Sequence, residues 1–331
     1  MAVLVARAPA RLDFGGGWTD VPPYSEERGG CVCNVAIELH AIATVRGAGV
    51  NPTAPGQGTM GPDNALALAA TRRAAMPNVR VDVHAEYPLG AGLGGSSAAG
   101  VAVLGALAAW RGEDVTAPWL AEESRRLEVE DLGIAGGRQD HYAAAMGGAL
   151  GLWFGAAVTA RRIDLPDATM DALSRRCIVV YTGQSRVSSD TITTVVDAYR
   201  RRERRVLEAL DRMRDLANAM VDALAAGDID TLGDLVGEHW AYQRSLHPAI
   251  PTPAIDAILA DAGKAGARGG KALGASGGGC VLAIAAEGRE DDVRRAMAAQ
   301  AAPIPVRVAR QGFHVVRRSE PVTSGAAGNG G

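Results

Sequence analysis

Residues 88–100 read PLGAGLGGSSAAG, and this stretch determines how the rest of the chain is organised. Four of its glycines fall within six positions, where they allow positive φ angles and leave backbone N–H groups free to face an anion. A helix is expected from Ser96 to Trp110, because Ser96 and Ser97 are good N-cap residues. The N-terminus of that helix adds free N–H groups and positive dipole charge. The stretch predicts a phosphate-binding loop; a plain turn packed under a helix is the alternative.

The residues before the loop, Val79 to Tyr87 (VRVDVHAEY), alternate between apolar and polar and predict a strand. The order strand, glycine loop, helix is common in nucleotide sites. The lysine and hydroxyl residue that close the common P-loop are missing after these glycines. The pattern therefore favours a phosphate site of another kind.

The composition is that of an ordinary globular protein. The chain has 331 residues, 47% of them apolar, and a formal net charge of −3, so no basic field favours nucleic acid or an anionic membrane. The longest apolar stretch, Ala98 to Trp110, is too short to span a membrane. The N-terminal sequence MAVLVARAPARL lacks the features of a signal peptide, so a cytoplasmic location is expected.

The cysteines and histidines show no metal-binding pattern. The four cysteines have neither a disulfide framework nor zinc-ligand spacing, and the six histidines are scattered. We expect buried, reduced thiols and no transition-metal site.

Two further segments hold polar side chains between turn-forming glycine and proline residues. Between strands expected at Val3–Ala6 and Cys33–Arg46, residues 7–24 (RAPARLDFGGGWTDVPPY) predict a site-building loop, with a surface turn as the alternative. In residues 133–148 (GIAGGRQDHYAAAMGG), a glycine turn delivers Asp140 to the start of a short helix. An acid at a helix start is usually a cap, and the two glutamates upstream are usual on a solvated helix face.

The rest of the chain predicts a change in secondary structure near Gly183, from a mixture of strands and helices to a mostly helical second half. A basic run at 199–205 is expected on a solvated surface, and a glycine loop at 271–285 runs into an apolar strand. The other predicted elements are helices at 65–76, 117–132, 191–226, 229–246, 252–265 and 290–300, strands at 150–154, 158–163 and 177–182, and a closing strand pair at 304–309 and 312–316. The Gly/Pro-rich segment 47–64 is expected to be a loop.

Three motifs, in order, resemble those of the GHMP kinase superfamily: APARLDFGGGWTD (8–20), PLGAGLGGSSAAG (88–100) and LGASGGGC (273–280). The resemblance spans residues 7 to about 316. Within the superfamily the chain is most similar to D-glycero-D-manno-heptose 7-phosphate kinases and fucokinase-like sugar 1-kinases. The segments FGGGWTDVPPY, EVEDLGIAGGRQDHYAAAMGG and YTGQSRVSSD carry that narrower similarity.

The resemblance implies an α+β, two-domain fold with the active site between the domains. Residues 1–182 would form a ribosomal-protein-S5-like N-terminal domain and residues 183–318 an α/β C-terminal domain, followed by a disordered tail at 319–331. It also implies ATP and Mg²⁺ as cofactors. The residues expected at ATP are Pro88, Gly90, Gly92, Leu93, Gly94, Gly95, Ser96, Ser97 and Ala98. The metal ligands would be Ser96 and Glu128, the latter preferred over Glu130 by its spacing from Asp140.

The resemblance assigns the chemistry to Asp140, which would orient the anomeric hydroxyl and accept its proton, and to Arg11, which would pair with Asp140. A carboxylate beside an arginine is expected to be ionised and a weak base. The residues expected at the substrate are Asp20, Gly17, Thr19, Gly137, Arg138, Arg186, Gly277 and Gly278. If the substrate already carries a phosphate, Arg138, Arg186 and Lys271 are the candidate cations.

The sequence departs from the family pattern at several positions. Ser276 interrupts a glycine run, Gly95 replaces a common serine, and His141 and Met146 replace the glutamine and phenylalanine usual in the heptose group. The sugar is therefore left open between a heptose 7-phosphate and a fucose- or galactose-like sugar, with a kinase of another small alcohol as a further alternative. A non-catalytic sugar and nucleotide sensor is the alternative of another class. We expect a small-molecule substrate and neither a nucleic-acid nor a membrane partner; a homodimer is left open.

Overall fold

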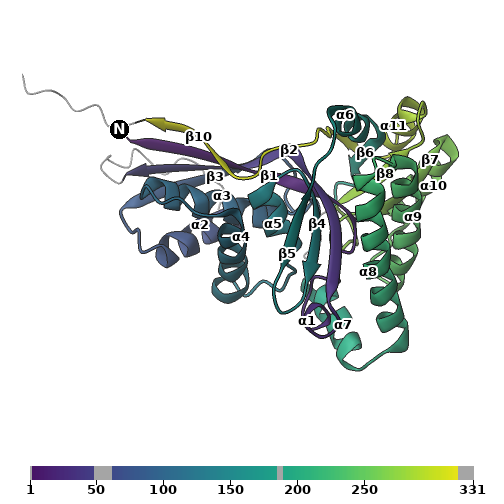
Figure 1. Ribbon diagram of the computed structural model, residues 1–331, viewed down its shortest axis with the longest axis horizontal. Helices are drawn as coiled ribbons and strands as arrows, with labels where there is room; N and C mark the ends of the chain where they lie inside the picture. The colour runs from purple at the N-terminus through teal and green to yellow at the C-terminus, as the bar shows by residue number, and fades with distance from the viewer. Residues whose placement is uncertain (1, 48–61, 185–188, 320–331) are drawn as a thin grey trace, which may run out of the picture.

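The computed structural model describes residues 2–47, 62–184 and 189–319. Within these ranges the chain forms two antiparallel sheets, each covered by helices (Figure 1). The predicted α+β class and two-domain architecture are confirmed. None of the helices described combines the length and apolar character needed to cross a membrane.

The first sheet is built on two long strands that pair with each other. Its strand order is β10-β1-β2-β4-β5, and β3 pairs with the second half of β2. Strand β2 is long enough to pair with β4 through its first half and with β3 through its second. The strands are β1 (Val3–Gly15), β2 (Gly30–Gly47), β3 (Val79–Ala85), β4 (Ala149–Phe154), β5 (Thr159–Ile163) and β10 (His314–Ser319).

Helices from the first half of the chain cover one face of this sheet. The central one, α3, is buried along most of its length, since alanine and glycine let it approach β1 and β2 closely. The last turn of α4 continues as a π-helical turn, η1. The elements are α2 (Pro62–Arg73), α3 (Gly95–Trp110), α4 (Ala117–Arg126), η1 (Leu127–Asp131) and α5 (Gln139–Met146). Helix α1 (Tyr24–Arg28) lies apart from them, where Tyr24 packs against Tyr199 (Figure 1).

The second sheet has the order β7-β8-β6-β9 and supports the helices on the right of Figure 1. Helix α8 also packs against β1 and β2, so it joins the two halves. The elements are α6 (Asp167–Arg176), β6 (Cys177–Tyr181), α7 (Ser189–Arg200), α8 (Arg204–Ala225), α9 (Ile229–Ser245), α10 (Pro253–Ala265), β7 (Ala267–Ala272), β8 (Cys280–Ala285), α11 (Glu290–Ala298) and β9 (Ala302–Ile304).

Several expectations are corrected by the sheets. Strand β1 runs to Gly15 instead of ending at Ala6, because its backbone pairs with β2 almost throughout. The closing strand pair is wrong: β9 pairs with β6, and β10 pairs with β1. Strand β6 therefore joins the second sheet although it precedes residue 183, and β10 returns the chain to the first sheet.

The remaining surface and core expectations agree with the structure. All four cysteines are free and buried. The basic run lies around the α7–α8 turn, where Arg201, Arg202 and Arg204 pair with neighbouring glutamates at the surface. Most of the segment expected as a 47–64 loop, and the tail after Ser319, lie outside the described residues.

Candidate active site

The centre of the candidate site is an ion pair between β1 and α5. The Arg11 side chain, 4% exposed, donates from Nε to Asp140 Oδ1 at 2.8 Å, and its Nη2 lies 2.7 Å from the same oxygen. Its Nη1 donates to the Gly92 carbonyl oxygen at 2.6 Å. The contact between Arg11 and Asp140 that the resemblance implies is present, and Arg11 ties it to the glycine loop.

The glycine loop connects β3 to α3. Gly90, Gly92 and Gly94 have φ angles of 69°, 76° and 71°, in the region that favours glycine. Gly94, not a serine, is the N-cap of α3, so the predicted serine cap is wrong. The left-handed Gly94 starts the helix one residue earlier than expected. Ser96 and Ser97 therefore lie in the first turn, with Ser96 exposed and Ser97 buried.

The other residues expected at ATP line or support the loop. A Cβ atom at Gly95 would collide with the Tyr87 ring, whose hydroxyl donates to the Gly95 carbonyl oxygen at 2.9 Å. Residue 95 therefore has no room for a side chain while Tyr87 holds this position. Leu93 and Ala98 have buried side chains, and the Pro88 carbonyl oxygen accepts from the Ala91 N–H at 3.3 Å.

The third glycine motif closes on this loop from the second sheet. The Cys280 N–H donates to the Ala91 carbonyl oxygen at 2.8 Å, and a Cβ atom at Gly92 would lie 2.6 Å from the Leu273 carbonyl oxygen. Gly277 and Gly278 have φ angles of 84° and 156° and turn the motif back. The two glycine motifs, far apart in sequence, therefore form one backbone surface.

Ser276, which interrupts the glycine run, has a φ angle of 72°. Its hydroxyl accepts a hydrogen bond from Gln243 Nε2 at 3.1 Å, and this contact helps to hold the residue in the left-handed backbone conformation.

Glu128 lies on η1, where it meets the first turn of α3. Its Oε2 accepts from Ser97 Oγ at 3.1 Å and lies 3.0 Å from His141 Nε2. Burial acts to raise the pKa of Glu128, but His141 and the hydroxyls of Ser96 and Ser97 outweigh it, so the pKa lies below its ordinary value. His141 Nδ1 lies 3.0 Å from Ser124 Oγ. The carboxylate is thus held ionised beside the loop.

The Glu128 cluster supplies hard oxygen donors, from one carboxylate and two hydroxyls, and such donors fit Mg²⁺. No cluster of three or more histidine, cysteine, aspartate or glutamate side chains with metal-binding geometry occurs in the part of the chain described. A site of the zinc or iron type therefore has no candidate there.

Asp20 connects the first motif to the helix that carries Asp140. Its Oδ2 accepts from the backbone N–H groups of Arg138 and Gln139 at 2.8 and 3.0 Å, and a Cβ atom at Gly137 would collide with it. Burial raises the pKa of Asp20 to about 6, against the lowering effect of the two N–H groups. Asp20 thereby fixes the start of α5.

The remaining substrate candidates differ in their surroundings. Gly17 leaves room for its neighbours, since a Cβ atom there would lie 2.5 Å from Asp13 Oδ2 and 2.9 Å from Gln139 Nε2. Thr19 is wholly buried, and its hydroxyl donates to the Gly16 carbonyl oxygen at 2.7 Å, so it holds the loop. Arg186 lies outside the described residues.

Lys271 is not available to a substrate phosphate, which corrects one candidate. Its side chain is 0% exposed, and Nζ donates to Asp13 Oδ2 at 3.0 Å. Burial acts to raise the pKa of Asp13, but Lys271 and Arg11 outweigh it and hold it below its ordinary value. Nearby, the Gly16 N–H donates to His239 Nε2 at 2.9 Å. This cluster joins β1 to β7 and α9 across the two sheets.

Two domain models of one family match the chain. The description "GHMP kinases N terminal domain" matches residues 64–148, and "GHMP kinases C terminal" matches residues 220–303. The chain belongs to the GHMP kinase family. These two matched segments contain the glycine loop, Glu128 and Asp140, and the third glycine motif, which are the parts that meet in the structure.

The relatives of this GHMP kinase include sugar kinases. The chain is 26% identical to the bifunctional fucokinase/GDP-fucose pyrophosphorylase of Arabidopsis thaliana, covering 84% of this chain but only 29% of that protein. It is 26% identical to the D-glycero-alpha-D-manno-heptose 7-phosphate kinase of Campylobacter jejuni, covering 85% of this chain and 89% of the relative. Members of this family are phosphotransferases.

A solved structure confirms the fold of this GHMP kinase. The D-glycero-D-manno-heptose 1-phosphate kinase from Bacteroides thetaiotaomicron superposes with a TM-score of 0.74 at 23% identity, covering 95% of this chain and 99% of that chain. At this identity the likeness concerns the fold alone.

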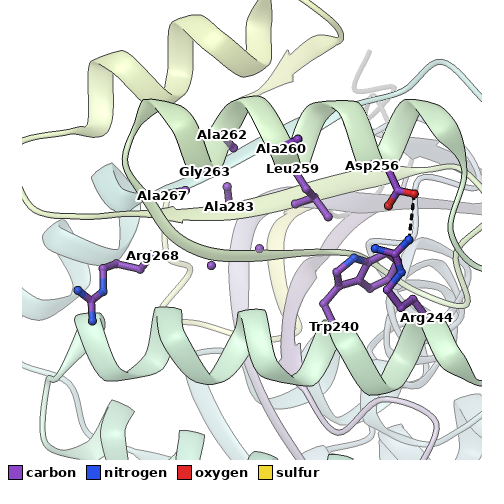
Figure 2. Close-up of a pocket in the computed structure, with 12 residues that line it drawn as sticks. Trp240, Arg244, Asp256, Leu259, Ala260, Ala262, Gly263, Ala267, Arg268 and Ala283 are labelled. Atoms are coloured by element: carbon purple, nitrogen blue, oxygen red, sulfur yellow. Dashed lines mark hydrogen bonds and ion pairs between the residues drawn. The ribbon is translucent and has the colours of Figure 1, made fainter.

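A separate cavity of this GHMP kinase lies away from the glycine loops. It has a volume of about 390 Å³ and lies between α9 and α10 over β7, with Trp240, Arg244 and Asp256 at one end (Figure 2). Arg244 pairs with Asp256 at 2.9 Å. None of the residues expected at ATP, metal or substrate lines it, so we place the site at the glycine loops instead.

The sequence analysis missed the Asp13–Lys271 pair and the contact of His141 with Glu128. The first joins residues 258 positions apart, which no local pattern reveals. The second had a signal, since His141 was already an unusual residue beside Asp140.

Proposed function

We propose that this chain is an ATP- and Mg²⁺-dependent kinase that phosphorylates the anomeric hydroxyl of a sugar, with D-glycero-D-manno-heptose 7-phosphate as the leading substrate. The observation that carries the proposal is the Arg11–Asp140 pair, attached by Arg11 to the carbonyl oxygen of Gly92 in the glycine loop. A carboxylate beside a phosphate-binding loop is the arrangement that phosphoryl transfer to a hydroxyl requires.

In this proposal the glycine loop and the start of α3 bind the ATP phosphates. Backbone N–H groups and the helix dipole supply positive potential without needing a lysine. Exposed Ser96 faces the nucleotide, and the third glycine motif covers it from the second sheet. Tyr87 holds Gly95 in place behind the loop.

Ser96 and Glu128 would hold Mg²⁺, with Ser97 and His141 orienting the Glu128 carboxylate. When bound, the ion would neutralise charge on the ATP phosphates and on the departing ADP. The hydrogen bonds of Glu128 keep its carboxylate ionised and ready for a cation.

Asp140 accepts the proton of the sugar hydroxyl. The hydroxyl oxygen forms a bond to the γ-phosphorus, the bond from that phosphorus to the β–γ bridging oxygen breaks, and ADP leaves. The proton passes to Asp140 as the bond between the hydroxyl oxygen and the γ-phosphorus forms. Arg11 stabilises the charge that develops on the attacking oxygen.

Asp20 and the backbone around Gly137 would bind the sugar. The Asp20 carboxylate lies at the start of the helix that carries Asp140, so a hydroxyl bound there would position the anomeric carbon near the base. The similarity to the Campylobacter jejuni heptose 7-phosphate kinase, which covers most of both chains, supports a heptose phosphate. A cytoplasmic location and a homodimer stay predictions.

An ADP-release assay with D-glycero-D-manno-heptose 7-phosphate, the unphosphorylated heptose, fucose and galactose tests the proposal. We expect turnover of the heptose phosphate, with the new phosphate on the anomeric oxygen by ³¹P NMR. Turnover of free sugars alone would contradict the heptose assignment and favour the fucose- or galactose-like alternative. Absence of turnover with every sugar, together with binding of sugar and ATP, would favour a sensor.

A further inference from the structure

Two arginines near the Asp20 end of α5 form no ion pair with any residue that the structure describes. Arg125 is near the end of α4, and Arg138 precedes α5 and donates its backbone N–H to Asp20 at 2.8 Å. Both side chains are half-buried. Arg125 Nε is buried and has no hydrogen-bond partner among the described residues.

The neighbouring carboxylates do not neutralise these arginines. Glu122, one turn before Arg125, accepts a hydrogen bond from the Tyr142 hydroxyl at 2.9 Å. One oxygen of Asp20, Oδ2, accepts from the N–H groups of Arg138 and Gln139, and Asp20 forms no ion pair with either arginine in the described residues. In the described chain, neither arginine side chain forms an ion pair.

Helix α4, which carries Arg125, packs against α5, and Arg138 is the N-cap residue of α5. Burial and the like charge of Arg138 lower the pKa of the Arg125 guanidinium, while Glu122, Glu26 and Asp20 act in the opposite direction. An arginine remains charged in proteins, so the guanidinium group of half-buried Arg125 is repelled by that of Arg138. That arrangement costs free energy unless an anion binds between them.

We propose that Arg125 and Arg138 form a subsite for the phosphate monoester that the sugar substrate already carries. This inference rests on the proposed sugar kinase function and deepens it. With the anomeric hydroxyl at Asp140 and a ring hydroxyl at Asp20, the remote end of the sugar reaches the two arginines. Guanidinium groups bind phosphate through paired hydrogen bonds, so the subsite selects a sugar phosphate over a free sugar.

The test compares D-glycero-D-manno-heptose 7-phosphate with the unphosphorylated heptose in the full chain. Arg125→Ala and Arg138→Ala are each expected to lower the ratio of kcat/KM for the phosphate ester to kcat/KM for the free heptose by about 10- to 100-fold, through loss of a charged hydrogen bond. The matched control is Arg126→Ala: Arg126 is exposed and pairs with Glu123 at 3.2 Å, so its ratio stays that of the wild type.

The outcomes separate the subsite from the kinase proposal. If the wild-type chain phosphorylates both sugars equally well, or if Arg125→Ala lowers both values in proportion, the subsite is wrong while the kinase proposal stands. If no sugar is phosphorylated, the kinase proposal fails, and calorimetric titration with heptose 7-phosphate decides the subsite. Binding that weakens in Arg125→Ala but not in Arg126→Ala supports it; no binding, or equal binding, overturns it.

A conservative variant guards against a folding defect. Arg125→Lys keeps the positive charge but loses the paired N–H donors of the guanidinium group. Its ratio of kcat/KM for the phosphate ester to kcat/KM for the free heptose is therefore expected to lie between those of the wild type and Arg125→Ala. A ratio for Arg125→Lys equal to that of the wild type, with a lowered ratio for Arg125→Ala, also supports a charge-based subsite. Equal ratios in all three would contradict it.

Discussion

Arg11 directs both Nε and Nη2 at a single oxygen of Asp140, Oδ1, at 2.8 and 2.7 Å. The other oxygen, Oδ2, lies toward Gly94, where a Cβ atom would come within 3.3 Å of it. In the described chain Oδ2 has no hydrogen-bond partner. One oxygen is therefore fixed by the arginine, and the other remains free to accept a proton at the edge of the glycine loop.

Replacing the proposed base is expected to separate binding from chemistry. Asp140→Asn keeps the shape of the side chain and removes its basicity, so kcat falls by about 10²- to 10⁴-fold while ATP affinity is retained. Steady-state kinetics and calorimetric ATP titration measure the two effects. Asp114→Asn, at an exposed position, is the matched control. A variant Asp140→Asn with normal kcat would show that Asp140 is not the base.

The glycine loop is expected to tolerate no side chain at Gly92. Gly92→Ala places a Cβ atom 2.6 Å from the Leu273 carbonyl oxygen, so the two glycine motifs must separate and ATP affinity falls. Gly133→Ala is the matched control, because Gly133 has a similar φ angle, 66° against 76° for Gly92. A Cβ atom at Gly133 would meet no atom within 4 Å. Both variants share a cost of about 1 kcal/mol for the positive φ angle. Equal ATP affinities in the two variants would contradict the proposed contact.

Glu128 and Glu130 provide a paired test of the metal site. Glu128→Gln is expected to weaken binding of Mn²⁺, used as a paramagnetic probe with ATP, by about 10- to 100-fold. Glu130, with a 58% exposed side chain, serves as the control, and Glu130→Gln leaves Mn²⁺ binding unchanged. Loss of Mn²⁺ binding in both variants, or only in Glu130→Gln, would show that Glu128 is not the ligand.

Asp20 gives the protein a specific pH dependence of stability. Burial raises its pKa to about 6 from 3.8, so the folded state binds the proton more tightly than the unfolded state. The stabilising effect of the proton is fully present below pH 3.8 and is lost as the pH rises through 6. Relative to Asp20→Asn, the unfolding free energy of the wild type is expected to fall by about 3 kcal/mol over this range. Urea unfolding of both proteins at several pH values measures it, and a wild-type unfolding free energy that stays level or rises with pH relative to that of Asp20→Asn would contradict it.

The buried charges of Asp13 and Lys271 are expected to contribute to the unfolding free energy jointly, so that the effects of removing them are not additive. Lys271→Met leaves Asp13 as a buried, unpaired charge, which costs about 3–5 kcal/mol of unfolding free energy. The double variant Asp13→Asn with Lys271→Met removes both charges and is expected to be more stable than Lys271→Met alone. Urea unfolding of the two single variants and the double variant gives the coupling. Additive effects would show that the two side chains do not interact in the folded protein.

The local pattern of the sequence predicted most helices and strands and the order of the three motifs. Alternation marked β3, and the alanine-rich run after the glycines marked α3, because hydrophobic periodicity is a local property. The residue types of the candidate site followed from the motifs as well. The end of β1 was missed, since its turn formers are overridden by pairing with β2.

Other features depend on which segments meet. Lys271 was a candidate cation for the substrate from its place near a glycine motif, yet it is buried against Asp13. Arg125 had no sequence signal, because its lack of an ion pair within the described residues depends on Tyr142 holding Glu122 and on the packing of α4 against α5.

The sequence by itself determined the glycine loop, the helix after it and the carboxylates that can serve phosphoryl transfer, because glycine conformation and residue chemistry are local. Only the tertiary structure decided that Arg11 fixes one oxygen of Asp140 and that the third motif closes on Gly92. It also left the buried Arg125 Nε without a hydrogen-bond partner among the described residues. Burial and pairing across long sequence separations set those relationships, and no local pattern encodes them.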